Sequence, residues 1–202
     1  MNLTNAMTLE SWVNLSSFPA SGSLYEIISK RSYFATDQQD FPVTLNITAS
    51  GAVDFRLSQG DDFTSDLILS SSPLQINQWY HIAATYTANG TSALYVNGVQ
   101  AASGSSNFTI SSNNQPWTIG RASQENGGGV NASYFKGRMD DVRIWNTART
   151  QAQIAASMNS QLAGNETGLV GYWDMNRIGQ GAGLTVDNKA SATGSALNGT
   201  TF

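Results

Sequence analysis

The sequence predicts an all-β protein, a sandwich or a barrel built around one core. Many short strand-like segments follow one another, and turn-forming residues separate them. A length of 202 residues suits one domain covering residues 1–202. Hydrophobic residues make up 40% and charged residues 12% of the chain. The remainder is rich in Ser, Thr, Asn and Gly, a composition typical of extracellular β-modules.

The strand-like segments are runs of apolar residues, several of which alternate with polar ones at a period of two. In order they cover residues 7–15, 25–31, 43–48, 53–58, 66–72, 80–87, 93–97, 99–103, 117–121, 135–146 and 168–175. In the first segment, Leu9 and Val13 alternate with Glu10 and Asn14. We therefore expect each such strand to have one buried face and one polar face.

Turns and one helix interrupt the strands. The pairs Asn89-Gly90 and Asn97-Gly98 stand between apolar runs and predict hairpin turns of an antiparallel meander. A helix is expected near residues 150–162, because T-Q-A-Q from residue 150 is a capping box. Four apolar residues follow at helical spacing and would lie on the sandwich: Ile154, Ala155, Met158 and Leu162. The C-terminal segment, residues 168–202, is expected to pack back on it.

Composition excludes several classes of function. A net charge of -4 without a Lys/Arg cluster argues against nucleic acid as a partner. No run approaches the roughly 20 apolar residues of a membrane span. The chain has no cysteine and one histidine, His81, so a zinc site with nitrogen and sulfur ligands is not expected. His81 lies within a strand and is expected to be a structural residue.

The acidic residues do not form a glycosidase pair. Retaining glycosidases need two carboxylates about 5 Å apart on one face. The adjacent acids Asp61-Asp62 and Asp140-Asp141 would point to opposite faces of a strand. A Ser-His-Asp arrangement would have to rely on His81 alone. The sequence therefore predicts a protein that is not an enzyme.

Three stretches in order resemble the LamG-like domain, which is laminin G-like, pentraxin-related and concanavalin A-like. They are MTLESWVNL (7–15), INQWYHIAATYTANGTSALYVNGVQAAS (76–103), and WTIGRAS (117–123) followed by FKGRMDDVRIWN (135–146) and GLVGYW (168–173). This resemblance implies a two-sheet antiparallel jelly-roll β-sandwich with the short helix near 150–162. It also gives Trp79 and His81 a framework role. Trp145 and Trp173 lie inside alternating strands and are expected to pack in the interior.

The resemblance also implies a possible calcium site, because two loops carry oxygen donors where pentraxin-like members bind the ion. The donors are Asp37, Asp40, Gln124, Glu125 and Asn126. Ala122 and Ser123 replace the first acids of the second loop, so a double-calcium site is not expected. A single calcium held by Asp37, Asp40 and Glu125 is one alternative, and solvated loop acids are the other.

Aromatic residues in or beside the same loops suggest a ligand rim. They are Tyr33, Phe34, Phe41, Tyr134 and Phe135. Exposed rings beside amides and acids can stack on sugars, although such rings can also pin long loops to a sandwich. The sequence thus predicts a non-catalytic module that binds glycan or an extracellular protein. It would belong to a larger secreted or cell-surface chain, and the alternative is a spacer domain of an adhesin or multidomain enzyme without a ligand.

Overall fold

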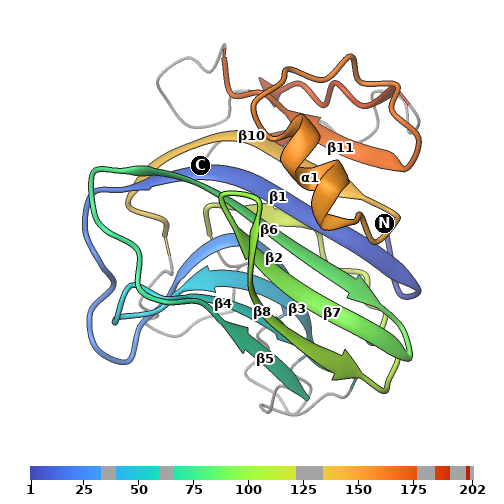
Figure 1. Ribbon diagram of the computed structural model, residues 1–202, viewed down its shortest axis with the longest axis horizontal. Coiled ribbons are helices and arrows are strands. Elements are labelled where there is room, and N and C mark those ends of the chain that lie inside the picture. Colours follow the sequence, from blue (N-terminus) through green and yellow to red (C-terminus); the bar gives the residue numbers. More distant parts are fainter. Residues whose placement is uncertain (33–39, 60–65, 122–133, 177–184, 192–198, 201–202) are drawn as a thin grey trace.

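The protein is a sandwich of two antiparallel sheets with one short helix on the outside (Figure 1). The computed structural model describes residues 1–32, 40–59, 66–121, 134–176, 185–191 and 199–200. Within these residues, the all-β two-sheet antiparallel fold and the single short helix predicted from the sequence are confirmed.

One sheet has six strands in the order β11-β10-β1-β6-β7-β8. Their bounds are β1 Ala6–Leu15, β6 Trp79–Thr87, β7 Gly90–Val96, β8 Val99–Ser106, β10 Gly137–Trp145 and β11 Leu169–Trp173. The other sheet has five strands in the order β5-β4-β3-β2-β9. Their bounds are β2 Tyr25–Ser32, β3 Asp40–Ile47, β4 Val53–Leu57, β5 Leu67–Ser70 and β9 Thr118–Ile119. The first strand of the chain thus lies inside the larger sheet, between β6 and β10.

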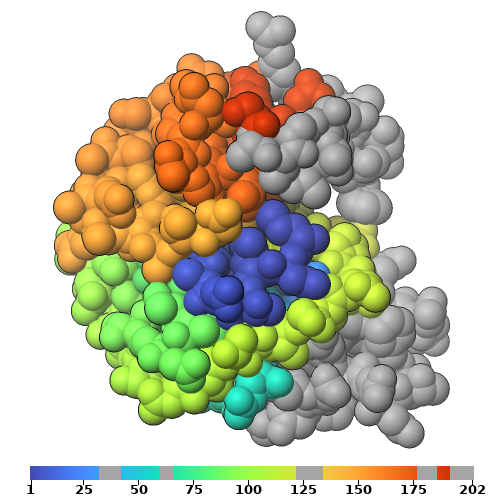
Figure 2. Space-filling model, turned by 90° about the vertical axis from the view of Figure 1, so that its right-hand side faces the viewer, coloured from blue at the N-terminus to red at the C-terminus, as the bar shows by residue number. Residues whose placement is uncertain are grey.

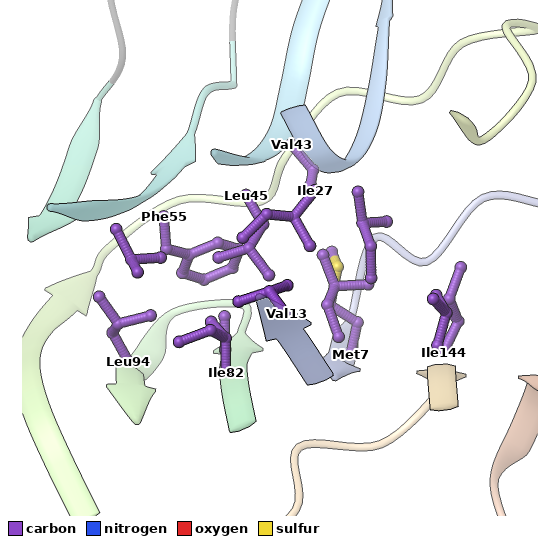
Figure 3. Packing of buried hydrophobic residues seen from close by; sticks show 14 of the residues in the cluster. Met7, Val13, Ile27, Val43, Leu45, Phe55, Ile82, Leu94 and Ile144 are labelled. Carbon is purple, nitrogen blue, oxygen red and sulfur yellow. The ribbon is translucent and has the colours of Figure 1, made fainter. Parts of the chain in front are cut away.

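The core lies between the sheets and is formed by the apolar positions of the alternating strands. In Figure 3, side chains from the two sheets point toward one another and fill the interior. The labelled residues are Met7, Val13, Ile82, Leu94 and Ile144 from the larger sheet, and Ile27, Val43, Leu45 and Phe55 from the smaller one. Leu45 and Phe55 are opposite each other on β3 and β4, and neither is exposed. Burial of such side chains is the main driving force for stacking the sheets.

The hairpin turns form where the Asn-Gly pairs predict them. Asn97 (φ 51°) and Gly98 (φ 74°) both have positive φ, as a type I′ turn between β7 and β8 requires. At the turn between β6 and β7, Asn89 has a φ of 52°. Asparagine tolerates this left-handed region better than most residues with a side chain.

The helix α1 is shorter than the sequence suggests. It runs over Gln151–Ser157, and Thr150 and Gln153 form the expected capping box. Ile154 is buried against Ala83, Ala93 and Tyr95 on the outer face of the six-stranded sheet. In the described part of the chain, no helix has the length and apolar character needed to cross a membrane.

Two of the apolar residues predicted for the inner face of this helix behave differently. Ala155 is exposed, and Leu162 lies beyond the end of α1. Leu162 packs instead against a satellite cluster made of Trp145, Leu169, Tyr172 and Ala190. The apolar residues therefore keep helical spacing in the sequence beyond Ser157, where the helix ends.

The C-terminal segment includes a strand pair that the sequence did not predict. β12 (Thr185–Val186) pairs with β13 (Gly199–Thr200). Between them, the Lys189 N–H donates to the Tyr172 carbonyl on β11 at 2.8 Å.

Figure 2 shows one end of the molecule, where the blue N-terminal residues lie between the orange and red C-terminal part and the yellow-green residues that follow β8.

Candidate functional site

The structure tests the predicted loop residues only in part. Tyr33, Phe34, Asp37, Gln124, Glu125 and Asn126 lie outside the described residues. Asp40 and Phe41 begin β3, where the backbone alone is described. The single calcium site that Asp37, Asp40 and Glu125 would share therefore stays a prediction.

The flanks of the two predicted calcium loops lie toward opposite ends of β2. The loop 33–39 joins Ser32 to Asp40, which are paired at the end of the β2–β3 hairpin. The loop 122–133 follows Gly120, whose N–H donates to the Ile27 carbonyl near the start of β2 at 2.9 Å. A shared ion would thus have to be reached from both ends of that strand.

The two predicted aromatic residues after the second loop have different environments. Phe135 packs against the core, and its ring meets that of Tyr25 edge-on with centroids 6.4 Å apart. Its N–H donates to the Gly120 carbonyl at 2.8 Å, so Phe135 anchors this end of the loop. Tyr134 is 47% exposed and is available to a ligand.

A buried ionic cluster occupies the outer face of the six-stranded sheet beneath α1. At its centre is Glu10 of β1, which has no exposed surface. Arg149 Nη1 lies 2.5 Å from Glu10 Oε1, while Arg143 Nη1 and His81 Nε2 lie 3.7 and 3.5 Å from Oε2. Burial alone would raise the pKa of Glu10, but the His81 contact and the Arg149 charge together lower it. The His81 contact is longer than a normal hydrogen bond, so we assign the larger effect to Arg149.

The same two arginines hold α1 and the residues after it on the sheet. Arg143 donates from Nη1 to the Ser157 carbonyl at 3.0 Å and from Nη2 to the Ser160 carbonyl at 2.7 Å. Arg149 Nη2 donates to the Gln153 carbonyl at 2.9 Å, and its guanidinium lies over the Trp145 ring at 4.0 Å. The cluster thus has a structural role. His81 is 1% exposed within it, which fits the framework role expected for this residue.

The outer face of the five-stranded sheet carries a second set of polar side chains, which we call the polar face. Because core residues alternate with them along the strands, these side chains point away from the interior. The polar face comprises Glu26, Ser29, Thr44, Asn46, Asp54, Arg56 and Ser70. In Figure 1, α1 lies on the side of the six-stranded sheet, away from this face. Five members of the polar face are nevertheless buried: Glu26, Ser29, Thr44, Asn46 and Asp54.

One half of the polar face is centred on the hydrogen-bonded carboxylate of Asp54. Asp54 accepts from Arg56 Nη2 at 2.7 Å and from the Ser70 hydroxyl at 2.6 Å, so each of its carboxylate oxygens has a donor. On β3, the Asn46 amide donates to the Thr44 hydroxyl at 3.0 Å. The Asn46 carbonyl oxygen accepts no hydrogen bond from the described residues.

The other half holds two buried acceptors, and the charged side chain of Arg31 lies beside one of them. Glu26 and Asn46 are directly opposite each other on β2 and β3, and neither has exposed surface. Arg31 Nη2 forms an ion pair with Glu26 Oε1 at 3.1 Å. Among the described residues, however, neither carboxylate oxygen of Glu26 nor Asn46 Oδ1 accepts a hydrogen bond. Burial raises the pKa of Glu26 to about 6, although Arg31 and Arg56 act against the rise.

An arrangement of this kind favours a group that can donate hydrogen bonds to both residues. A buried acceptor without a donor costs about 1–3 kcal/mol, so two of them side by side are unfavourable. Two hydroxyl groups, each donating to one residue, would satisfy them, and a proton on Glu26 could itself be donated to the Asn46 carbonyl oxygen. The alternation in residues 43–48 places Asn46 on the outward face, and Glu26 is paired with it across the strands. Neither the alternation nor the sequence around Glu26 shows that an acceptor here lacks a partner.

Trp79 is a further residue that the sequence did not identify as accessible. The framework role implied a packed ring, yet 43% of Trp79 is exposed at the start of β6. Trp145 and Trp173 are 3% and 6% exposed, as the packing role expected for them requires. The period of two places Trp79 on the outward face of β6, but it does not say whether another element covers that face.

The sandwich, its helix and its polar outer face define a lectin-like β-sandwich. The chain belongs to the concanavalin A-like lectin/glucanases superfamily, whose Laminin_G_3 model matches residues 1–155. The match includes β1 to β10 and most of α1, so both faces described above lie within it.

Solved structures with the same fold include proteins of several kinds. A candidate carbohydrate-binding protein from Bacteroides ovatus is 24% identical, with a TM-score of 0.71 over 98% of this chain and 52% of that one. A heptameric SAP-like pentraxin from Limulus polyphemus is 21% identical, with a TM-score of 0.55 over 78% of this chain and 72% of that one. The binding domain of botulinum neurotoxin DC, solved in complex with SialylT, is 15% identical, with a TM-score of 0.52 over 81% and 37%.

These similarities show the fold. This chain spans about half the length of the Bacteroides ovatus protein, so the activity of that whole protein is not transferred to it. A search of curated protein sequences gives no match.

Proposed function

We propose that the chain is a non-catalytic glycan-binding module of a secreted or cell-surface protein, and that the glycan is held at the polar face. The observation that carries this proposal is the pair of buried acceptors, Glu26 and Asn46, which have no donor among the described residues. Saccharides offer dense arrays of hydroxyl donors. Arg31 and Arg56, whose side chains are 18% and 32% exposed, provide contacts at the surface.

The known relatives support glycan as the ligand class. The Bacteroides ovatus protein is described as a candidate carbohydrate-binding protein, and the botulinum neurotoxin domain was solved with SialylT. Calcium contributes in this proposal through Asp37 and Asp40, which lie between β2 and the start of β3, and through Glu125, which follows β9 in sequence. We treat this ion as a separate part of the proposal.

The arrangement of carboxylates supports a binding role rather than catalysis. Glu26 and Asp54 lie on β2 and β4 with β3 between them, so their backbones are about 9.6 Å apart, twice the usual strand spacing. Retaining glycosidases hold the reacting carboxyl groups about 5 Å apart and inverting ones about 6.5–9.5 Å apart, so this spacing argues only against a retaining mechanism. In addition, both oxygens of Asp54 are already engaged by Arg56 and Ser70.

A glycan array followed by titration calorimetry tests the proposal. The best glycan should bind Glu26→Gln at least about tenfold more weakly than the wild type, because the amide replaces acceptor oxygen with a donor. Asp187→Asn is the matched control, because this exposed carboxylate lies on the C-terminal segment. Equal affinity of wild type and Glu26→Gln would contradict the proposal, and failure to bind any glycan would favour the spacer alternative.

The calcium part is tested separately. The same titration is repeated in millimolar calcium and in EDTA, with Asp37→Ala and Asp40→Ala. If calcium contributes, EDTA weakens the wild type and leaves the two variants unchanged. Identical affinities in both buffers would remove calcium from the proposal and leave the glycan site in place.

A further inference from the structure

The outer face of the six-stranded sheet carries an accessible surface at the end where β6 begins. This is the end opposite to Thr87, the last residue of β6. Trp79 on β6 is opposite Asn14 on β1, and Asn14 is opposite Arg138 on β10. Their neighbours Val13 and Met139 pack in or against the core, so the three side chains point outward in one row. We call this row the Trp79 shelf.

The residues after α1 cover part of the outer face of this sheet. The Trp79 shelf begins where they stop covering it. Trp12 is the next outward residue of β1, and its indole N–H donates to the Met158 carbonyl at 2.8 Å. Trp12 is therefore partly buried, whereas Trp79 is 43% exposed and Arg138 is also exposed. A tryptophan this exposed loses much of the stabilisation that burial of its ring would bring.

Hydrogen bonds hold the turn that precedes the exposed ring. The Asn77 N–H donates to the Leu15 carbonyl at 2.7 Å. The Gln78 amide donates to Gln75 Oε1 at 2.7 Å, and the Tyr80 hydroxyl donates to Gln78 Oε1 at 3.1 Å. The indole thus stands on an ordered turn and strand, so a ligand would bind it with little loss of conformational freedom.

The chemistry of the shelf fits an acidic sugar. An indole presents a flat apolar face with a polar N–H at its edge, and the Asn14 amide supplies both a donor and an acceptor. Arg138 and Lys136 are exposed cations on a chain whose net charge is -4, so this surface attracts anions locally. The next outward carboxylate on β10, Asp140, accepts from the Asp141 N–H at 2.9 Å. One ring surrounded by polar groups is too small for a stable protein interface.

We propose that the Trp79 shelf is a second saccharide-binding surface, which takes a sugar bearing a carboxylate or sulfate. The sugar ring stacks on Trp79, its hydroxyls bond to Asn14, and its anionic group pairs with Arg138. The shelf lies on the opposite sheet from the polar face, so it binds independently of Glu26. Two such surfaces would let one module contact two chains of a polysaccharide.

Titration of the whole chain with defined oligosaccharides tests this surface. The probes are tetragalacturonate, a sulfated heparin tetrasaccharide and neutral cellotetraose, and binding is followed through the Trp79 indole N–H signal in NMR spectra. At least one acidic probe should shift this signal and bind about tenfold or more tightly than cellotetraose. Trp79→Ala and Arg138→Gln should each weaken it about tenfold, while Trp79→Phe retains most of the affinity.

Two control variants separate this surface from other causes. Val99→Ala removes a side chain that is 64% exposed on β8, which β7 separates from β6, and should leave affinity unchanged. Glu26→Gln, which alters the polar face, reports whether that face takes part in binding the acidic probe. Equal binding of acidic and neutral probes, an unshifted Trp79 signal, or wild-type affinity in Trp79→Ala would overturn the inference. If Glu26→Gln loses binding of the acidic probe while Trp79→Ala and Arg138→Gln keep it, that binding belongs to the polar face instead.

Discussion

Two fully buried glutamates on opposite sheets have opposite surroundings. Glu10, beneath α1, has Arg149 2.5 Å from one carboxylate oxygen, and Arg143 and His81 near the other, which accepts no hydrogen bond from the described residues; its pKa is lowered. Glu26, on the polar face, accepts no hydrogen bond from the described residues, and its pKa is raised to about 6. Both residues sit at outward positions, each beside a register shift in the pairing of its strand. The difference shows that a buried carboxylate fixes structure where the protein supplies its donors, and costs stability where it does not.

The comparison predicts its largest effect at Glu10. Glu10→Ala leaves Arg143 and Arg149 buried without their central counter-charge, which should lower the free energy of unfolding by about 3–5 kcal/mol. Urea unfolding at neutral pH, followed by circular dichroism, measures the loss. A decrease below about 1 kcal/mol, the value of an exposed ion pair, would show that the cluster does not hold the helix.

Glu26 should respond in the opposite direction. Raising its pKa from 4.5 to about 6 corresponds to about 2 kcal/mol of destabilisation of the charged form. Glu26→Gln, which carries no charge, should therefore unfold at higher urea concentration than the wild type at pH 7. A variant less stable than the wild type would mean that the charged form of Glu26 stabilises the fold.

The pH dependence of stability separates the two residues. Between pH 4.5 and 6 the folded state holds a proton on Glu26 that the unfolded state has released, so stability should fall as the pH rises through this window. Glu10 has a lowered pKa, so its contribution is present above pH 4.5 and is lost at lower pH. Unfolding curves of wild type and Glu26→Gln at half-unit intervals give both slopes, and the first slope should be absent in the variant.

The smallest predicted effect concerns the cap of α1. Thr150→Ala removes the hydroxyl that accepts from the Gln153 N–H, which should cost about 1 kcal/mol. Thr150→Ser keeps the hydroxyl and serves as the control. If Thr150→Ala costs as much as Glu10→Ala, the capping box rather than the ionic cluster would be the main attachment of the helix.

The strands and turns could be predicted because their causes are local. Alternation along residues 7–15 and 43–48 places the core side chains, and the Asn97-Gly98 pair has the positive φ values that its turn needs. The two-residue strands β12 and β13 are too short to show a period. The helical spacing to Leu162 did not reveal where the helix ends.

The site depended on contacts that no local pattern contains. Glu10 and Glu26 have the same outward placement in sequence, and only the packing of α1 and its arginines distinguishes them. Trp79 likewise lies in a family motif that implied framework, and its exposure depends on where the residues after α1 stop covering the sheet.

The most direct test is thermal unfolding of wild type and Glu26→Gln with and without the glycan found on the array. A ligand at a hundredfold excess over Kd stabilises the folded state by about 2.7 kcal/mol. If Glu26 is kept for a ligand, the wild type gains this stabilisation, while Glu26→Gln is more stable without glycan and gains little from it. The same gain in both proteins would contradict the account, because the buried carboxylate would then have no part in binding.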